Sequence, residues 1–269
     1  VPSTEFEAPA AIVDGKQIGL EKLKDDVAAL SAHLQTFSEQ RWLLLSEDAY
    51  AIAVGFLAAL YAERVVVLPA NLQIGHIAEL SDQFDGVLVH EQAVPTDAKA
   101  LSIFRVDTVA NNQFLGPLNA EQARVIFHTS GTTGEPVSVH KSLTCLENEL
   151  VVLRGLFKLN TPYVVLATVP AHHIYGLLFR VLWPLVAGQP FVAETLRYPH
   201  ELERASQTAE RKILVSSPAF LVRALNVLDM ETLRENISDV FSSGGPLSPE
   251  VAAAYNAKLA RPIVEIYGS

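Results

Sequence analysis

Residues 124–136 read Arg-Val-Ile-Phe-His-Thr-Ser-Gly-Thr-Thr-Gly-Glu-Pro, an apolar run followed by glycines and small hydroxyl residues. A strand that ends in such a loop exposes backbone N–H groups, and Gly131 and Gly134 carry no side chain to keep a ligand away. Backbone donors and short hydroxyls can surround phosphate oxygens at close range. The pattern therefore predicts a strand over 124–128 followed by a loop for nucleotide phosphates.

The loop differs from the Walker A phosphate loop, which needs a Gly-Lys-Ser/Thr step after four variable residues. Glu135 follows Gly134 here, so a generic P-loop nucleotide hydrolase is the least favoured interpretation. A plain turn leading from a strand into a helix has a similar composition. The neighbouring segments are needed to choose between a turn and a ligand site.

Composition narrows the class of protein. The chain has 269 residues, 49% of them apolar, a net charge of −10 and the single cysteine Cys145. The apolar content suffices for a large core, and an acidic surface argues against nucleic-acid binding. No apolar run is long enough for a membrane span. One cysteine cannot form an internal disulfide, so a reducing, cytoplasmic location is expected.

Helical and strand-like patterns alternate along the chain and predict an α/β fold with layered, mainly parallel sheets flanked by helices. Helices are expected over 20–34, 48–62 and 142–157 and after Pro218 and Pro249, and strands over 42–45, 64–68, 86–89, 124–128, 163–168, 212–216, 239–242 and 263–266. Residues 90–123 are the most irregular part. We therefore expect two α/β subdomains, 1–123 and 124–269.

Three loops in this pattern each follow a predicted strand: Thr129–Gly134, Ser242–Pro246 and Tyr267–Ser269. In parallel sheets, ligands bind beyond the carboxyl ends of the strands. The loops are therefore expected to border one cleft.

Four segments in one order resemble the ANL superfamily of adenylate-forming enzymes, which includes acyl- and aryl-CoA synthetases, luciferases and peptide-synthetase adenylation domains. They are Thr129–Pro136, Val169–Gly176 (Val-Pro-Ala-His-His-Ile-Tyr-Gly), Ser242–Leu247 (Ser-Ser-Gly-Gly-Pro-Leu) and Glu265–Ser269 (Glu-Ile-Tyr-Gly-Ser). The resemblance extends over most of residues 10–269, although Glu63 stands where a Gly is usual. It implies the large N-terminal domain of that fold. It also implies ATP-dependent activation of a carboxylic acid to an acyl-adenylate, followed by transfer to a thiol of CoA or an acyl carrier protein.

The resemblance assigns residues to the ATP site. The phosphates would be wrapped by the first loop, and the adenine would lie along the third segment and stack on Tyr267. The residues so assigned are Thr129, Ser130, Gly131, Thr132, Thr133, Gly134, Ser243, Gly244, Gly245, Pro246, Tyr267 and Gly268.

The resemblance also assigns the reacting end of the acid. His173 would sit between the carboxylate and the α-phosphate, where a histidine can donate a hydrogen bond to developing charge. The channel for the acid would use Tyr175, Pro218 and Gly245, together with Leu178 and Ser217. A histidine packed at the start of an apolar helix is the structural alternative for His173.

Lys141 marks a departure from the family pattern. A Pro-Lys-Gly step usually follows the phosphate loop, whereas this chain has Pro136-Val137-Ser138 and a lysine only at 141. Glu-Pro followed shortly by Lys and Leu resembles a bacterial branch encoded with aryl-polyene and xanthomonadin pigment pathways. We therefore assign Lys141 as the residue that supplies the phosphate charge, with a surface lysine at a helix start as the alternative.

The family motif that begins at Tyr267 continues with Thr-Glu, and that glutamate holds the Mg²⁺, so the main metal ligand is expected outside this chain and no metal ligand is assigned within it. The catalytic lysine of the small C-terminal domain is likewise outside it. The chain is therefore expected to be an N-terminal fragment that is inactive alone. Two alternatives stay open: a fatty-acyl-CoA ligase, and a non-catalytic nucleotide- or partner-binding module.

Overall fold

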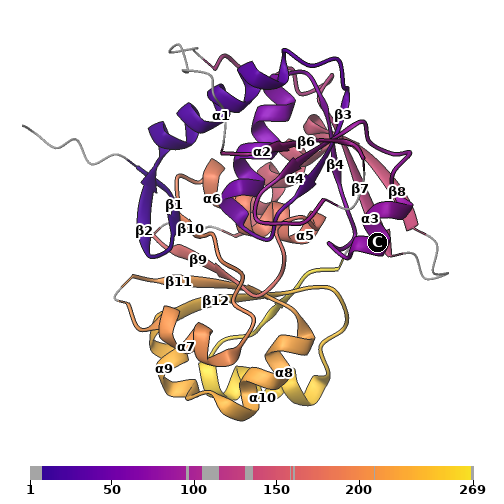
Figure 1. Ribbon diagram of the computed structural model, residues 1–269. Helices are drawn as coiled ribbons and strands as arrows, with labels where there is room; N and C mark the ends of the chain where they lie inside the picture. Colours follow the sequence, from indigo (N-terminus) through magenta and orange to yellow (C-terminus); the bar gives the residue numbers. More distant parts are fainter. Residues whose placement is uncertain are drawn as a thin grey trace, which may run out of the picture.

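The computed structural model describes residues 8–94, 97–104, 115–130, 136–157, 159, 161–208 and 210–267, and its described strands form two sheets (Figure 1). The first has the order β6-β5-β3-β4-β7-β8. Its strands are Lys99–Ser102 (β6), Gly86–Val89 (β5), Arg41–Leu45 (β3), Val65–Leu68 (β4), Arg124–Ser130 (β7) and Pro136–Ser142 (β8). All neighbours in this sheet are parallel except β7 and β8, which form an antiparallel pair.

The second sheet has the order β13-β12-β11-β9-β10-β1-β2. Its strands are Val264–Glu265 (β13), Ile237–Ser242 (β12), Lys212–Ser216 (β11), Val164–Ala167 (β9), Phe191–Val192 (β10), Pro9–Val13 (β1) and Lys16–Gly19 (β2). Only the β1–β2 pair is antiparallel. The mainly parallel α/β architecture predicted from the sequence is confirmed.

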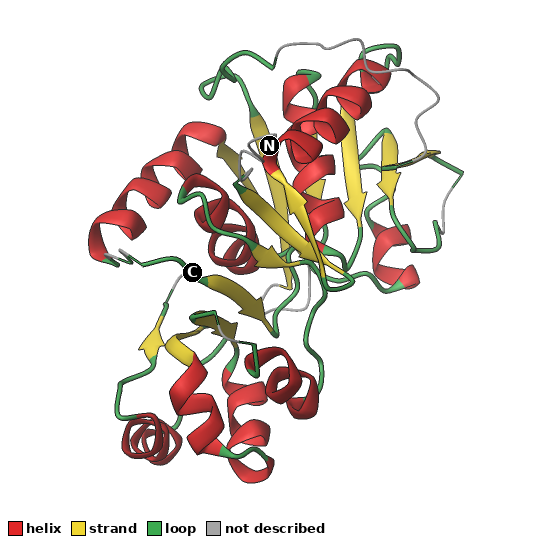
Figure 2. Cartoon of the chain, turned by 90° about the vertical axis from the view of Figure 1, so that its left-hand side faces the viewer, coloured by secondary structure: helices red, strands yellow, loops and turns green. Residues whose placement is uncertain are grey.

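Helices fill three layers around the two sheets. The largest core cluster lies between the sheets, and a separate apolar cluster covers the outer face of each. The middle layer contains Leu20–Leu34 (α1), Ala49–Tyr61 (α2), Leu143–Leu156 (α4), Ile174–Gly176 (α5), the π-helix Leu177–Leu182 (η1) and Trp183–Val186 (α6). The outer layers contain Ile74–Glu79 (α3) on the first sheet and Pro199–Ser206 (α7), Pro218–Val227 (α8), Met230–Asn236 (α9) and Pro249–Leu259 (α10) on the second. In Figure 2 this last group lies beneath the strands of its sheet.

Helix α2 shows why the middle layer is stable. Eleven of its residues are buried, and Asp48 caps its start by accepting a hydrogen bond of 2.7 Å from the N–H of Ala51. A helix that is apolar on all sides must be buried on all sides. Helix α2 therefore fits only between two sheets, and it holds them together.

Strand β8, which lies between the glycine loop and the next helix, was not predicted from the sequence. The helix predicted over 142–157 is confirmed as α4, which begins at Leu143 with Ser142 as its cap. The segment 90–123, expected to be irregular, contains strand β6. The two sheets do not separate at 123/124, because residues 9–19 belong to the second sheet and residues 124–142 to the first, and the division into two subdomains stays a prediction.

Candidate functional site

Small hydroxyl residues line the carboxyl-terminal edge of the second sheet. Ser216 ends β11, and its hydroxyl lies 2.8 Å from that of Thr168, which follows β9. Ser242 ends β12 in register with Ser216. Because the strands are parallel, their ends meet at one edge, and that edge carries a row of hydroxyls suited to a polar ligand.

The third predicted segment begins at this edge. The N–H of Ser243 donates to the carbonyl of Ser216 at 3.2 Å, and the N–H of Ile266 donates to the carbonyl of Ser242 at 2.8 Å. Gly244 has a φ of +89° and nothing within 4 Å of the position a Cβ would take. Glycine therefore permits both the turn and a close approach by a flat group.

The loop after β9 carries His173, which lies at the N-cap of α5. Its path is fixed by Gly176, because a Cβ at that position would lie 1.9 Å from the carbonyl oxygen of Pro170. The proline and glycine of this motif thus belong to one tight turn. That turn brings His173 to the same edge of the sheet.

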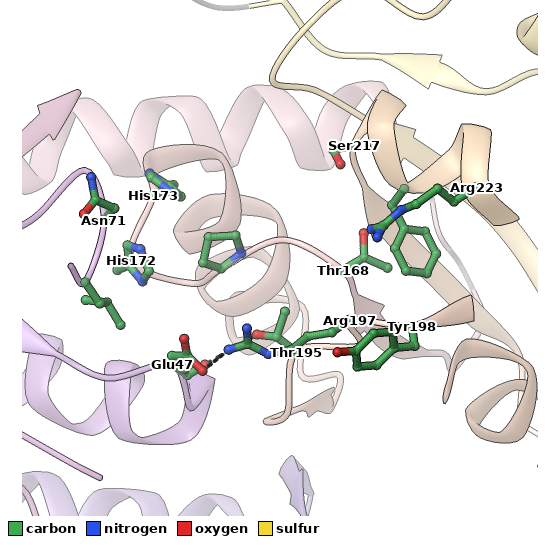
Figure 3. A pocket seen from close by; sticks show the side chains of 13 residues that line it. Glu47, Asn71, Thr168, His172, His173, Thr195, Arg197, Tyr198, Ser217 and Arg223 are labelled. Carbon is green, nitrogen blue, oxygen red and sulfur yellow. Dashed lines mark hydrogen bonds and ion pairs between the residues drawn. The ribbon is translucent and has the colours of Figure 1, made fainter. Parts of the chain in front are cut away.

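A cleft of about 500 Å³ opens at this edge (Figure 3). The loops after β3, β4, β9, β10 and β11 contribute to its walls. Figure 3 shows His172 and His173 on the side of Asn71, with Ser217 and Arg223 on the opposite side. The lining residues are Glu47, Asn71, Leu72, Thr168, Pro170, His172, His173, Thr195, Arg197, Tyr198, Ser217, Phe220 and Arg223.

Both histidines of the cleft are kept neutral. Burial lowers the pKa of His172 to about 3, with a smaller lowering by the neighbouring His173 and a small opposing effect of the Ser46 backbone. Burial also lowers the pKa of His173. The two ring centroids are 4.6 Å apart. A neutral His173 can donate one N–H to an anionic group in the cleft without bringing a charge of its own.

An ion pair joins the two halves of the cleft wall. Arg197 from the loop after β10 pairs with Glu47 from the loop after β3 (Figure 3). The same loops meet through the N–H of Ala49, which donates to the carbonyl of Ala193 at 2.9 Å. The cleft therefore spans elements of both sheets.

The structure brings some of the predicted ATP-site residues to this region. Thr129 and Ser130 end β7, which pairs with β4 in parallel, and β4 leads to the cleft-lining Asn71. Tyr267 is 96% exposed rather than packed in the core. Ser243, Gly244, Gly245 and Pro246 follow β12 at the sheet edge, whereas Gly131, Thr132, Thr133, Gly134 and Gly268 lie outside the described residues.

Of the predicted acid-binding residues, only His173 and Ser217 line the cleft. Pro218 follows Ser217 as the first residue of α8. The ring of Tyr175 packs on Phe179 at 5.0 Å between centroids, and burial raises the pKa of its hydroxyl. Leu178, by contrast, is a buried core residue.

Lys141 is not brought to the cleft. In the β7–β8 hairpin it pairs with Val125, whereas Ser130 and Pro136 pair beside the glycine loop. The two pairs are five steps apart along the strand, which is roughly 17 Å at about 3.4 Å per residue. A lysine side chain does not cover that distance along the strand.

Sequence reasoning missed several cleft residues: Glu47, Asn71, Thr195, Arg197 and Arg223. The first four lie in loops that follow strands, so the expectation that ligands bind beyond the carboxyl ends of parallel strands covers them as well. None stands in a recognisable motif, and their approach depends on the packing of one sheet against the other.

In the part of the chain that the structure describes, no group of three or more His, Cys, Asp or Glu side chains could hold a metal ion. None of the described helices is both long and apolar enough to cross a bilayer.

A family model described as AMP-binding enzyme matches residues 3–269. The chain belongs to the AMP-binding enzyme family. Solved structures share the fold: the ATP-bound MatB from Rhodopseudomonas palustris superposes with a TM-score of 0.82 at 18% identity, covering 98% of this chain and 58% of that one. The resemblance to adenylate-forming enzymes predicted from four motifs is thereby confirmed.

Several curated relatives of this family member are named ligases. A 4-coumarate–CoA ligase of Halorhodospira halophila is 29% identical over 131 residues, which are 49% of this chain and 31% of that protein. A 3,4-dihydroxybenzoate–[aryl-carrier protein] ligase of Bacillus anthracis is 26% identical over 102 residues, 38% of this chain and 25% of that protein. The matched stretches thus span less than a third of these relatives.

Proposed function

We propose that the protein carrying this chain activates a carboxylic acid with ATP and passes the acyl group to a thiol. The chief support is the His173 loop, which a glycine-dependent turn holds in a cleft at the carboxyl-terminal edge of the second sheet, the edge at which β12 leads into the Ser243–Pro246 segment. The family match and the ligase names of its relatives agree with this chemistry.

In the proposed reaction, a carboxylate oxygen attacks the α-phosphorus of ATP and the bond to pyrophosphate breaks. The acyl-adenylate then reacts with a thiol at its carbonyl carbon, and AMP leaves. Negative charge builds up at the α-phosphate in the first step, so fixed donors there lower the barrier. His173, kept neutral by burial, is proposed to donate to this group or to the carboxylate.

The remaining assignments follow from position. We propose that Thr129–Gly134 bind the phosphates, that Ser243–Pro246 lie along the adenine and that the exposed Tyr267 stacks on it. ATP use is supported by the ATP-bound relative in the same fold. A magnesium ion bound with ATP would neutralise phosphate charge, but no described residue cluster offers its ligands.

The lining of the cleft supports a small acid rather than a long acyl chain as the substrate. Most of the lining residues are polar, with Leu72, Pro170 and Phe220 as apolar members. We therefore propose an aryl or other short acid, with a fatty acid as the alternative. The pigment-pathway branch, the choice between CoA and carrier protein, the cytoplasmic location and the inactivity of this chain alone stay predictions.

Product analysis tests this proposal. The full-length protein is incubated with ATP, Mg²⁺, a panel of benzoic, cinnamic and fatty acids, and either CoA or a phosphopantetheinylated carrier protein. AMP release together with a thioester detected by mass spectrometry is expected for one acid class and one thiol. ATP binding without AMP release for any acid would instead favour a non-catalytic nucleotide-binding module.

A further inference from the structure

Arg180 is fully buried in η1, with none of its surface exposed, and all four hydrogen bonds of its guanidinium go to neutral oxygens. Nη1 donates to the carbonyl of Val169 at 2.8 Å and to the hydroxyl of Thr195 at 2.7 Å. Nη2 donates to the carbonyl of Ala193 at 2.5 Å and to that of Val192 at 3.4 Å. A buried charge is costly unless it is hydrogen-bonded. The four bonds use both terminal nitrogens and leave Nε without an acceptor among the described residues, so the loops that supply the acceptors are held in a defined geometry.

These acceptors belong to two loops of the cleft. Val169 begins the segment that carries His172 and His173, and Thr195 itself lines the cleft. The hydroxyl of Thr195 also approaches the carbonyl of Glu47 at 3.5 Å, which ties in the loop after β3. Arg180 therefore lies directly behind the junction of three cleft walls.

The local helix geometry supports a specific role for this residue. Residues 177–182 form a π-helix, and π-helical turns inside α-helical segments are rare and frequent at functional sites. Pro184 follows closely and has no N–H to continue the α-helical pattern of hydrogen bonds. No carboxylate within salt-bridge distance neutralises Arg180 among the described residues, although Asp48 and Glu194 lie near enough to favour its charge.

We propose that Arg180 is a positioning residue that fixes the His173 loop against the Thr195 loop and so preorganises the cleft. It touches neither ATP nor the acid; it acts through the backbone of Val169 and the side chain of Thr195. Lysine could not replace it, because an ammonium group cannot present the planar, multi-donor fork that reaches acceptors in two loops at once.

The arginine-to-lysine variant R180K tests the proposal, because it keeps the charge and removes the fork. NMR titration of ¹³C-labelled histidines reports the pKa of His173, whose signal is identified by its loss in H173Q. Burial is what lowers this pKa, so a loosened loop should let it rise toward about 6.5. The matched control is R261K, because Arg261 donates to the carbonyls of Ile237 and Ser238 without lining the cleft.

We expect the His173 pKa to rise in R180K and to stay at the wild-type value in R261K. Thermal melting curves check that both variants are folded. If R180K does not fold, T195V removes one acceptor only and should shift the pKa in the same direction by less. A wild-type His173 pKa in folded R180K, or in T195V where R180K fails to fold, would overturn the proposal. An equal shift in R261K would do the same.

The activity readout rests on the proposed function. For adenylate formation, R180K should lower kcat by about 10- to 100-fold, as expected for a small misplacement of a reacting group, and should change KM for ATP much less. A wild-type kcat would contradict the positioning role. If the wild-type protein forms no adenylate, the proposed function fails, whereas the NMR result still decides the role of Arg180.

Discussion

Gly176 sets the geometry of the His173 loop because glycine has no Cβ atom. The residue has ordinary right-handed helical angles, φ −65° and ψ −41°, so alanine would be acceptable to the backbone there. The obstacle is the carbonyl oxygen of Pro170, only 1.9 Å from the position of a Cβ. Space rather than conformational freedom therefore requires glycine.

We predict that Gly176→Ala lowers the free energy of unfolding by about 1–3 kcal/mol, the usual range for overpacking. Urea denaturation measures this change. Gly155→Ala is the matched control, because Gly155 lies in α4 with nothing within 4 Å of its Cβ position. That control should be neutral or slightly stabilising. Equal unfolding energies for the two variants would show that the loop yields to the clash.

His172 should make folding sensitive to acid. Its pKa is about 3 when folded, because burial disfavours the charged ring, and about 6.5 when unfolded. The unfolded chain therefore takes up a proton first as the pH falls. The stabilising contribution is fully present above pH 6.5 and is lost progressively as the pH falls toward 3.

We predict that this residue alone removes about 2 kcal/mol of stability between about pH 6.5 and pH 5. Urea unfolding of wild type and His172→Asn at both pH values gives the difference. The asparagine variant should be less stable at neutral pH but should lose less on acidification. The same pH dependence in both proteins would exclude His172 as its source.

Tyr267 offers a test of the adenine site that is separate from folding, because its side chain is 96% exposed. Tyr267→Ala should leave the melting temperature unchanged and weaken ATP binding by about 0.5–1.5 kcal/mol, the worth of an aromatic stack. Tyr267→Phe keeps the ring and should bind ATP as the wild type does. Isothermal titration calorimetry measures both affinities, and an unchanged affinity of the alanine variant would rule out stacking.

Glu63 shows how far single residues could be interpreted from the sequence. The resemblance marked it as a departure from a usual glycine, and the structure gives it a φ of +57°, in the left-handed region that glycine adopts most easily. The sequence alone shows that this position departs from the family pattern. It does not predict the backbone conformation, because that depends on how the chain turns from α2 into β4.

At the scale of elements, well-buried segments were predicted well and a strand at the sheet edge was missed. Helix α1 and strands β5 and β11 have the expected bounds, because α1 buries apolar residues at helical spacing and the two strands are buried along almost their whole length. Strand β8 was missed because residues 137–142 are all exposed or half-buried and pair at the edge of the sheet, so their pattern resembles a loop.

The β7–β8 hairpin leads to a prediction for Lys141. Because the strand register places it roughly 17 Å from the loop end of the hairpin, Lys141→Ala should leave the ATP affinity of the full-length protein unchanged. Calorimetric titration with ATP measures this. A loss of about tenfold or more, equal to about 1.4 kcal/mol, would restore the role in phosphate binding predicted from the sequence.

At the scale of the whole molecule, the cleft exists because two sheets pack on a common helical layer. Motifs predicted His173 and the loop after β12, since each carries a recognisable residue order. The opposite wall, with Glu47 and Arg197, could not be predicted, because these residues lie 150 positions apart and meet only after the sheets have packed. Long-range packing of this kind leaves no local signal in the sequence.

ATP–pyrophosphate exchange tests the proposed activation step most directly. It is measured on the full-length protein for the wild type and for His173→Ala. Exchange that depends on an added acid is expected for the wild type. In the histidine variant, exchange should fall by about 100-fold or more, as for the loss of a donor to developing charge, while the melting temperature changes little. Wild-type exchange in His173→Ala, or no exchange by the wild type with any acid despite ATP binding, would contradict an adenylate-forming site built around His173.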